Sequence, residues 1–68
     1  MDDRYRNPEA FIADVKRALR DHNKTNAALA RAMGQSPSAI ARWFNRRVTP
    51  SVGSMIKMDD ALHKLLYG

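Results

Sequence analysis

The side chains best suited to a chemical task lie in a short basic segment near the middle of this 68-residue chain. Arg42 and Ser38 are four residues apart, a spacing that places both on one face of a helix. A guanidinium can donate two hydrogen bonds to guanine, and a hydroxyl can donate or accept one. If this segment is an exposed helix, the pair suits the reading of base edges in a DNA groove.

The distribution of charge favours a polyanionic partner. Residues 16–47 carry eight Lys and Arg side chains against one acid, whereas the two ends together carry four against six. A basic segment inside a small domain is typical of nucleic-acid binding. The charge alone fits equally well with a solvated surface that only keeps the protein in solution.

Catalytic and metal-binding arrangements are missing from the sequence. The two histidines, His22 and His63, are far apart, and neither has other ligands at metal-binding spacing. Asp59 and Asp60 are adjacent, so they point to different faces of a helix. We therefore expect no enzymatic activity, no metal, no cofactor and no small-molecule ligand.

Composition also predicts the surroundings of the protein. The chain has no cysteine, which fits a reducing compartment. No apolar run approaches the roughly 18 residues that span a membrane, and the first residues lack a signal-peptide pattern. The sequence predicts a cytoplasmic, nucleoid-associated protein that does not contact a membrane.

The spacing of apolar residues predicts an all-α fold of four or five short helices. The first helix begins after Asn7, with Pro8 at its first position, and frays over residues 21–23. Its inward face is expected to hold Phe11, Ile12, Val15, Ala18 and Leu19. A flexible arm over residues 1–7 precedes a single domain over residues 8–68.

The next two helices are separated by a glycine turn. A second helix follows the cap Thr25 and ends before Gly34, where glycine allows a left-handed turn. A third helix follows the cap Ser36, and its expected inner face is anchored by Ile40 and Trp43, with Phe44 as a further candidate. The last helix follows Ser51 and either continues through Leu66 or bends near His63, with an inward face of Val52, Met55, Ile56 and Leu62.

This middle segment resembles a known family. The shared residues are Leu29-Ala30, Met33-Gly34, Ser36-Pro37-Ser38, Ile40, Arg42-Trp43, Asn45 and Pro50-Ser51. Together they look like the lambda-repressor/Cro (Xre-type) helix-turn-helix family, over roughly residues 10–62, with the helix-turn-helix at about 25–46. The resemblance implies a lambda-repressor-like fold and a sequence-specific regulator of transcription that binds double-stranded DNA, with a bacterial or phage origin.

Two positions depart from the family pattern. Arg46 stands where the family usually has glycine, so either Asn45 or Arg46 must adopt the left-handed conformation, which Asn tolerates better. Asp59 stands where the family prefers a small apolar residue, which puts the packing of the last helix in question.

Candidate DNA contacts follow from this arrangement. With the third helix, about residues 36–44, in the major groove, the expected base contacts are Arg42, Ser38, Ala39, Gln35 and Ser36. The expected phosphate contacts lie at the start of the second helix and the end of the third: Lys24, Thr25, Asn26, Asn45, Arg46 and Arg47.

One recognition helix reads only a few base pairs, so we expect a homodimer on a palindromic operator, acting as a repressor by promoter occlusion. The C-terminal residues Leu65, Leu66 and Tyr67 are the expected dimer interface. The alternative is that they fold onto the first helix and complete the core. A competing function for the same fold is a small phage- or plasmid-type protein-interaction module, an antitoxin or a binder of a host regulator, with Arg42, Arg46 and Arg47 gripping an acidic partner.

Overall fold

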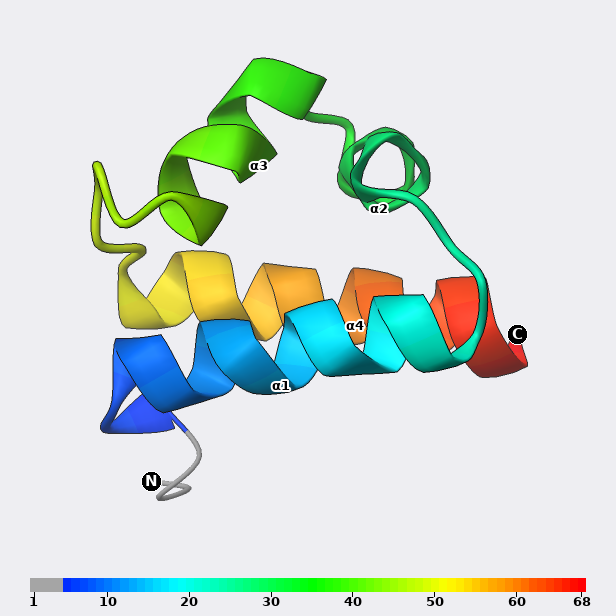
Figure 1. The fold of residues 1–68 in the computed structure, drawn as a ribbon, viewed down its shortest axis with the longest axis horizontal. Coiled ribbons are helices and arrows are strands. Elements are labelled where there is room, and N and C mark those ends of the chain that lie inside the picture. The colour runs from blue at the N-terminus through cyan, green and yellow to red at the C-terminus, as the bar shows by residue number, and fades with distance from the viewer. Residues whose placement is uncertain (1–4) are drawn as a thin grey trace.

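The computed structural model describes residues 5–68, and within these residues it contains four α-helices and no strand. They are α1 (Pro8–Asp21), α2 (Asn26–Met33), α3 (Pro37–Phe44) and α4 (Val52–Tyr67). The long helices α1 and α4 lie side by side and run in the same direction, and α2 and α3 lie together over them (Figure 1). The all-α prediction is confirmed, and α4 continues past His63 as a single helix.

All four predicted N-caps are confirmed. In each helix the capping side chain accepts a hydrogen bond from the backbone N–H three residues later, over 3.0 to 3.3 Å. Each cap satisfies one backbone donor that has no partner inside its own helix. The four capping residues are Asn7, Thr25, Ser36 and Ser51.

The first three helices end in the same way, with one residue in the left-handed conformation. These residues are Asn23 (φ 57°), Gly34 (φ 70°) and Arg46 (φ 63°). In each case the next residue donates its N–H to the carbonyl five positions earlier, over 2.8 to 2.9 Å. This bond satisfies a free carbonyl at the helix end and turns the chain sharply. Gly34 takes the conformation predicted for it.

The core lies between all four helices and corrects the prediction for α3. Ile40 is fully buried and Phe44 is 6% exposed, whereas Trp43 is only half-buried and packs against the edge of the core. The sequence predicts Ile40 and Trp43 as the residues that hold this helix, with Phe44 as a further candidate. The structure instead places Phe44 beside Ile40 in the core, because the two are one helical turn apart and share the face that meets it.

The inward face of α4 also differs from the prediction. Ile56 is 43% exposed, while Met58, which was not assigned to the core, is fully buried. The buried face of α4 runs through Met55, Met58, Ala61 and Leu62, and Ile56 is rotated away from that series. Ile56 directly follows the buried Met55, so its side chain leaves the helix on a different side and faces solvent.

The polar residue Asp59 is accommodated by a contact from the N-terminal segment. The Tyr5 ring lies 5.6 Å from the Phe11 ring, and the Tyr5 hydroxyl donates a hydrogen bond of 3.0 Å to Oδ2 of Asp59. A half-buried carboxylate thereby gains a partner where an apolar side chain was expected. Residues 1–4 of the expected arm lie outside the described residues, and its boundary at residue 7 stays a prediction.

None of the helices in residues 5–68 combines the length and the hydropathy required to cross a membrane. No group of three or more His, Cys, Asp or Glu side chains in the same residues is arranged to hold a metal ion.

Candidate nucleic-acid interface

The short helix α3 divides its residues between the core and solvent. Ile40 and Phe44 point inward, and Ser38 and Arg42 are exposed on the other side. Among the described residues no ion pair involves Arg42, so its guanidinium has no acid to neutralise it. A face of this kind presents five N–H donors of Arg42 and one hydroxyl of Ser38 to an approaching ligand.

The other predicted base contacts lie at or near the start of α3. Gln35 and Ser36 are exposed, and Ala39 is half-buried. The Oγ of Ser36 accepts the capping hydrogen bond from the N–H of Ala39, at 3.3 Å. Its hydroxyl proton can still be donated to a base or a phosphate. Ser36 can therefore serve as a helix cap and a ligand contact together.

The first group of predicted phosphate contacts lies at the start of α2. Lys24, Thr25 and Asn26 are exposed and line one hollow. The Thr25 hydroxyl caps the helix by accepting the N–H of Ala28 at 3.0 Å. The remaining free N–H groups and the dipole of α2 favour an anion here.

The second group, Asn45, Arg46 and Arg47, is exposed at the end of α3. Asn45 continues the helix, because its N–H bonds to the carbonyl of Ala41 at 2.8 Å. The left-handed position consequently falls on Arg46 rather than on Asn45, although Asn would tolerate it better.

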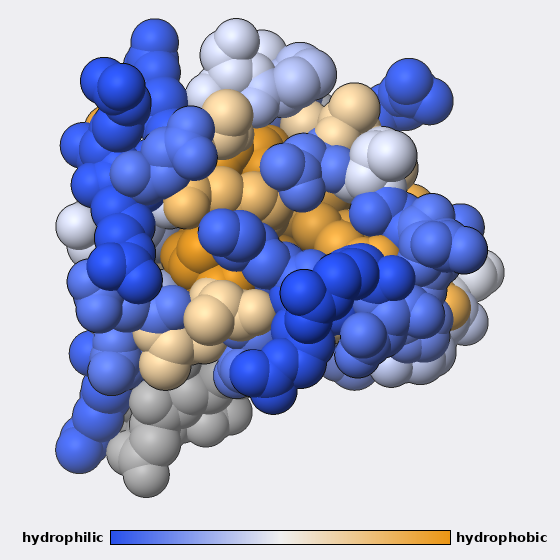
Figure 2. Space-filling view, in the orientation of Figure 1, coloured by the Kyte–Doolittle hydropathy of each residue, from blue (hydrophilic) through white to orange (hydrophobic). Residues whose placement is uncertain are grey.

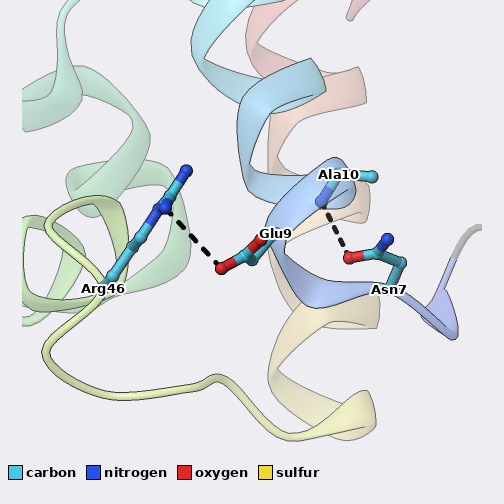
Figure 3. Close-up of polar contacts among 4 residues, drawn as sticks. All are labelled: Asn7, Glu9, Ala10 and Arg46. Atoms are coloured by element: carbon cyan, nitrogen blue, oxygen red, sulfur yellow. Dashed lines mark hydrogen bonds and ion pairs between the residues drawn. The ribbon is translucent and has the colours of Figure 1, made fainter.

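Arg46 also forms the ion pair of this region. Its Nη1 lies 3.7 Å from Oε1 of Glu9, at the start of α1 (Figure 3). The side chains of Arg46 and Glu9 are 76% and 69% exposed, so water and salt screen their attraction. An exposed pair of this kind contributes little to stability and holds Arg46 only weakly.

Three cations that were not predicted from the sequence to belong to the site also line the hollow at the start of α2. Lys16, Arg17 and Arg20 of α1 line it together with Lys24. Their spacing on one side of a helix was visible in the sequence. Their position beside the start of α2 depends on how the helices pack, which the sequence did not specify.

The three C-terminal residues predicted to form a dimer interface are divided between core and surface. Leu65 and Leu66 are half-buried and pack against the core of their own chain. Tyr67 is 70% exposed, and its ring lies nearly perpendicular to the His22 ring, with 5.6 Å between the ring centroids. Tyr67 is thus the member of this group with the most surface free for a partner.

Comparison with known proteins places this arrangement in a family. A family model described as helix-turn-helix matches residues 15–66. The chain belongs to the Xre/lambda-repressor-like helix-turn-helix family. Its members are DNA-binding regulatory domains rather than enzymes. The comparisons with curated proteins and with solved structures gave no match.

The left-handed Arg46 generates a stability prediction. Replacing Arg46 with glycine should raise the free energy of unfolding by about 0.5–1 kcal/mol. A residue with a side chain pays roughly 1–2 kcal/mol to adopt the left-handed conformation, and glycine avoids this cost. Part of the gain is lost because glycine also has more conformational freedom in the unfolded chain. Urea unfolding of Arg46→Gly measures the change. Glu9→Gln is the control: it removes the ion pair together with the favourable interaction of Glu9 with the start of α1, and should lower the free energy of unfolding by no more than about 1 kcal/mol. An Arg46→Gly protein less stable than the parent would contradict the argument.

Proposed function

We propose that this helix-turn-helix regulator recognises a specific double-stranded DNA sequence by placing α3 in the major groove. One observation carries the proposal: α3 buries Ile40 and Phe44 while Arg42 stays exposed with no acidic partner among the described residues. The major groove admits an α-helix and presents a different pattern of donors and acceptors for each base pair.

Arg42 is the proposed main determinant of sequence. Its guanidinium can donate two hydrogen bonds to O6 and N7 of one guanine, a contact worth about 1–3 kcal/mol of discrimination. Ser38, one turn earlier, contacts the neighbouring base pair by hydrogen bonding. The Ala39 methyl suits apolar contact with thymine, and Gln35 and Ser36 contact a base or phosphate at the helix entrance.

Phosphate contacts on both sides of α3 fix its position in the groove. Lys24, Thr25 and Asn26 hold one stretch of backbone at the start of α2. Asn45, Arg46 and Arg47 hold another at the end of α3. Both groups are exposed, which supports this role.

We further propose that the protein represses transcription by covering a promoter, in a bacterium or a phage, in the cytoplasm at the nucleoid. Occlusion needs only tight binding at the right site, which a small DNA-binding domain can supply. The resemblance to the lambda-repressor/Cro family supports the mode of action and the origin.

A homodimer on a palindromic operator would supply the specificity that one recognition helix lacks. Because Leu65 and Leu66 lie partly against their own core, the proposed interface centres on the exposed ring of Tyr67, with the accessible edges of the two leucines beside it.

The DNA proposal predicts the effect of losing the guanidinium. Sites selected by the protein from a random duplex library should share a short motif containing guanine. Arg42→Ala should bind the selected duplex on the order of 10- to 100-fold more weakly and lose its preference at one guanine position. Fluorescence anisotropy measures both effects.

The control for this experiment is Lys57→Ala, which removes an exposed cation of α4. It should leave the preference for the selected sequence unchanged. Equal affinity of the parent protein for selected and random duplexes would overturn sequence-specific recognition and favour the protein-interaction alternative.

The dimer proposal predicts that removing the exposed ring of Tyr67 lowers the mass of the assembly in solution. Tyr67→Ser should shift the protein from dimer toward monomer without unfolding it, because Tyr67 is largely outside the core. Sedimentation velocity at several concentrations measures the shift. Ile56→Ser, which alters another exposed apolar residue of α4, is the control and should leave the dimer intact. A monomeric parent protein, or a Tyr67→Ser dimer as stable as the parent, would contradict this interface.

A further inference from the structure

We infer that α1 is a second DNA-contacting helix, whose basic side holds the sugar–phosphate backbone beyond the stretch reached from α2. The surface is the α1 basic patch, defined as Lys16, Arg17, Arg20 and Lys24 around the hollow at the start of α2. The inference rests on the proposed function and extends it to a larger DNA footprint.

The position of the patch makes it continuous with the proposed interface. Lys16, Arg20 and Lys24 follow one another at four-residue intervals, and the hollow that they line also contains Thr25 and Asn26. Hydrophilic residues cover the C-terminal half of α1 in Figure 2. A DNA strand held by the start of α2 would therefore meet more cations by continuing along α1.

The patch also reaches toward the recognition helix. The ammonium of Lys16 lies 5.9 Å from the centroid of the Phe44 ring, at the end of α3. This cation–π distance places the Lys16 side chain between α1 and α3. Phe44 thus holds α3 in the core, and its ring also contacts Lys16 of the α1 basic patch.

Two of the three acidic residues of α1 lie away from the hollow of the patch, and the third, Glu9, lines another hollow together with Lys16. Asp14 and Asp21 line a separate hollow between α1 and α4, together with Asp59 of α4. No acidic residue lines the hollow of the patch, although Arg17 borders both hollows. The hollow of the patch is therefore the more basic of the two, and it is the side of α1 that attracts a polyanion.

Part of the patch is electrostatically unfavourable in the free protein. Lys16 and Arg20 have the same charge at a spacing of four residues, which weakens a helix, whereas Arg17 is spaced favourably, at three and four residues, from Asp14 and Asp21. Among the described residues no ion pair neutralises the four cations. Phosphates of DNA would supply the missing negative charge.

The test compares two double variants that remove the same charge. Lys16→Gln with Arg20→Gln alters the patch, and Lys57→Gln with Lys64→Gln alters exposed cations of α4 that do not line the hollow. Binding to the selected duplex and to a random duplex is measured by anisotropy across salt concentrations. Thermal melting establishes that each variant is folded at the temperature of measurement.

We expect the patch variant to bind both duplexes more weakly, on the order of tenfold at 0.1 M salt, with its selectivity retained. The slope of log affinity against log salt should decrease in magnitude by about 1.8, which corresponds to two lost phosphate contacts. The α4 variant should keep the slope of the parent.

Equal slopes for the patch variant and the α4 variant would overturn the inference while leaving sequence recognition by α3 intact. A loss of selectivity in the patch variant would also overturn it, because backbone contacts affect all sequences alike. If the parent protein itself showed no selectivity, the proposed function would fail, which is a different result.

Discussion

The burial of Ile40 and Phe44 beneath α3 is the constraint on which the rest of this structure depends. An isolated helix of eight residues is unstable in water, so packing decides both its existence and its rotation. With residues 40 and 44 held in the core, the helical period turns residues 38 and 42 toward solvent. The same packing that stabilises the domain therefore selects the side chains of α3 that are exposed to a ligand.

The ends of α3 show how local structure and function compete at this site. Its start combines a capping hydroxyl with proline at the first position, which favours a helix strongly. Its end places Arg46 in a conformation that glycine adopts more easily. A charged side chain at that position gives the region a cation that glycine lacks. In the proposed interface this cation contacts a phosphate, which would offset the conformational cost at Arg46.

The features that could be predicted from the sequence are those set by neighbouring residues. The four capping residues and the turn at Gly34 are local, and the sequence identified each of them. The choice between Trp43 and Phe44, or between Ile56 and Met58, depends on which helix lies opposite. Both members of each pair are apolar, so only the packed structure distinguishes them. The partnership of Tyr5 with Asp59, which are 54 residues apart, depends on the packed structure for the same reason.

Unfolding of two adjacent variants tests the central claim most directly. Phe44→Ala should lower the free energy of unfolding by about 3–5 kcal/mol, close to the whole stability of a domain this small, and abolish DNA binding. Trp43→Ala should lower it by about 2 kcal/mol, because that ring is only half-buried, and should leave a folded protein that binds the selected duplex. A Trp43→Ala protein less stable than Phe44→Ala would contradict the account of how α3 is held.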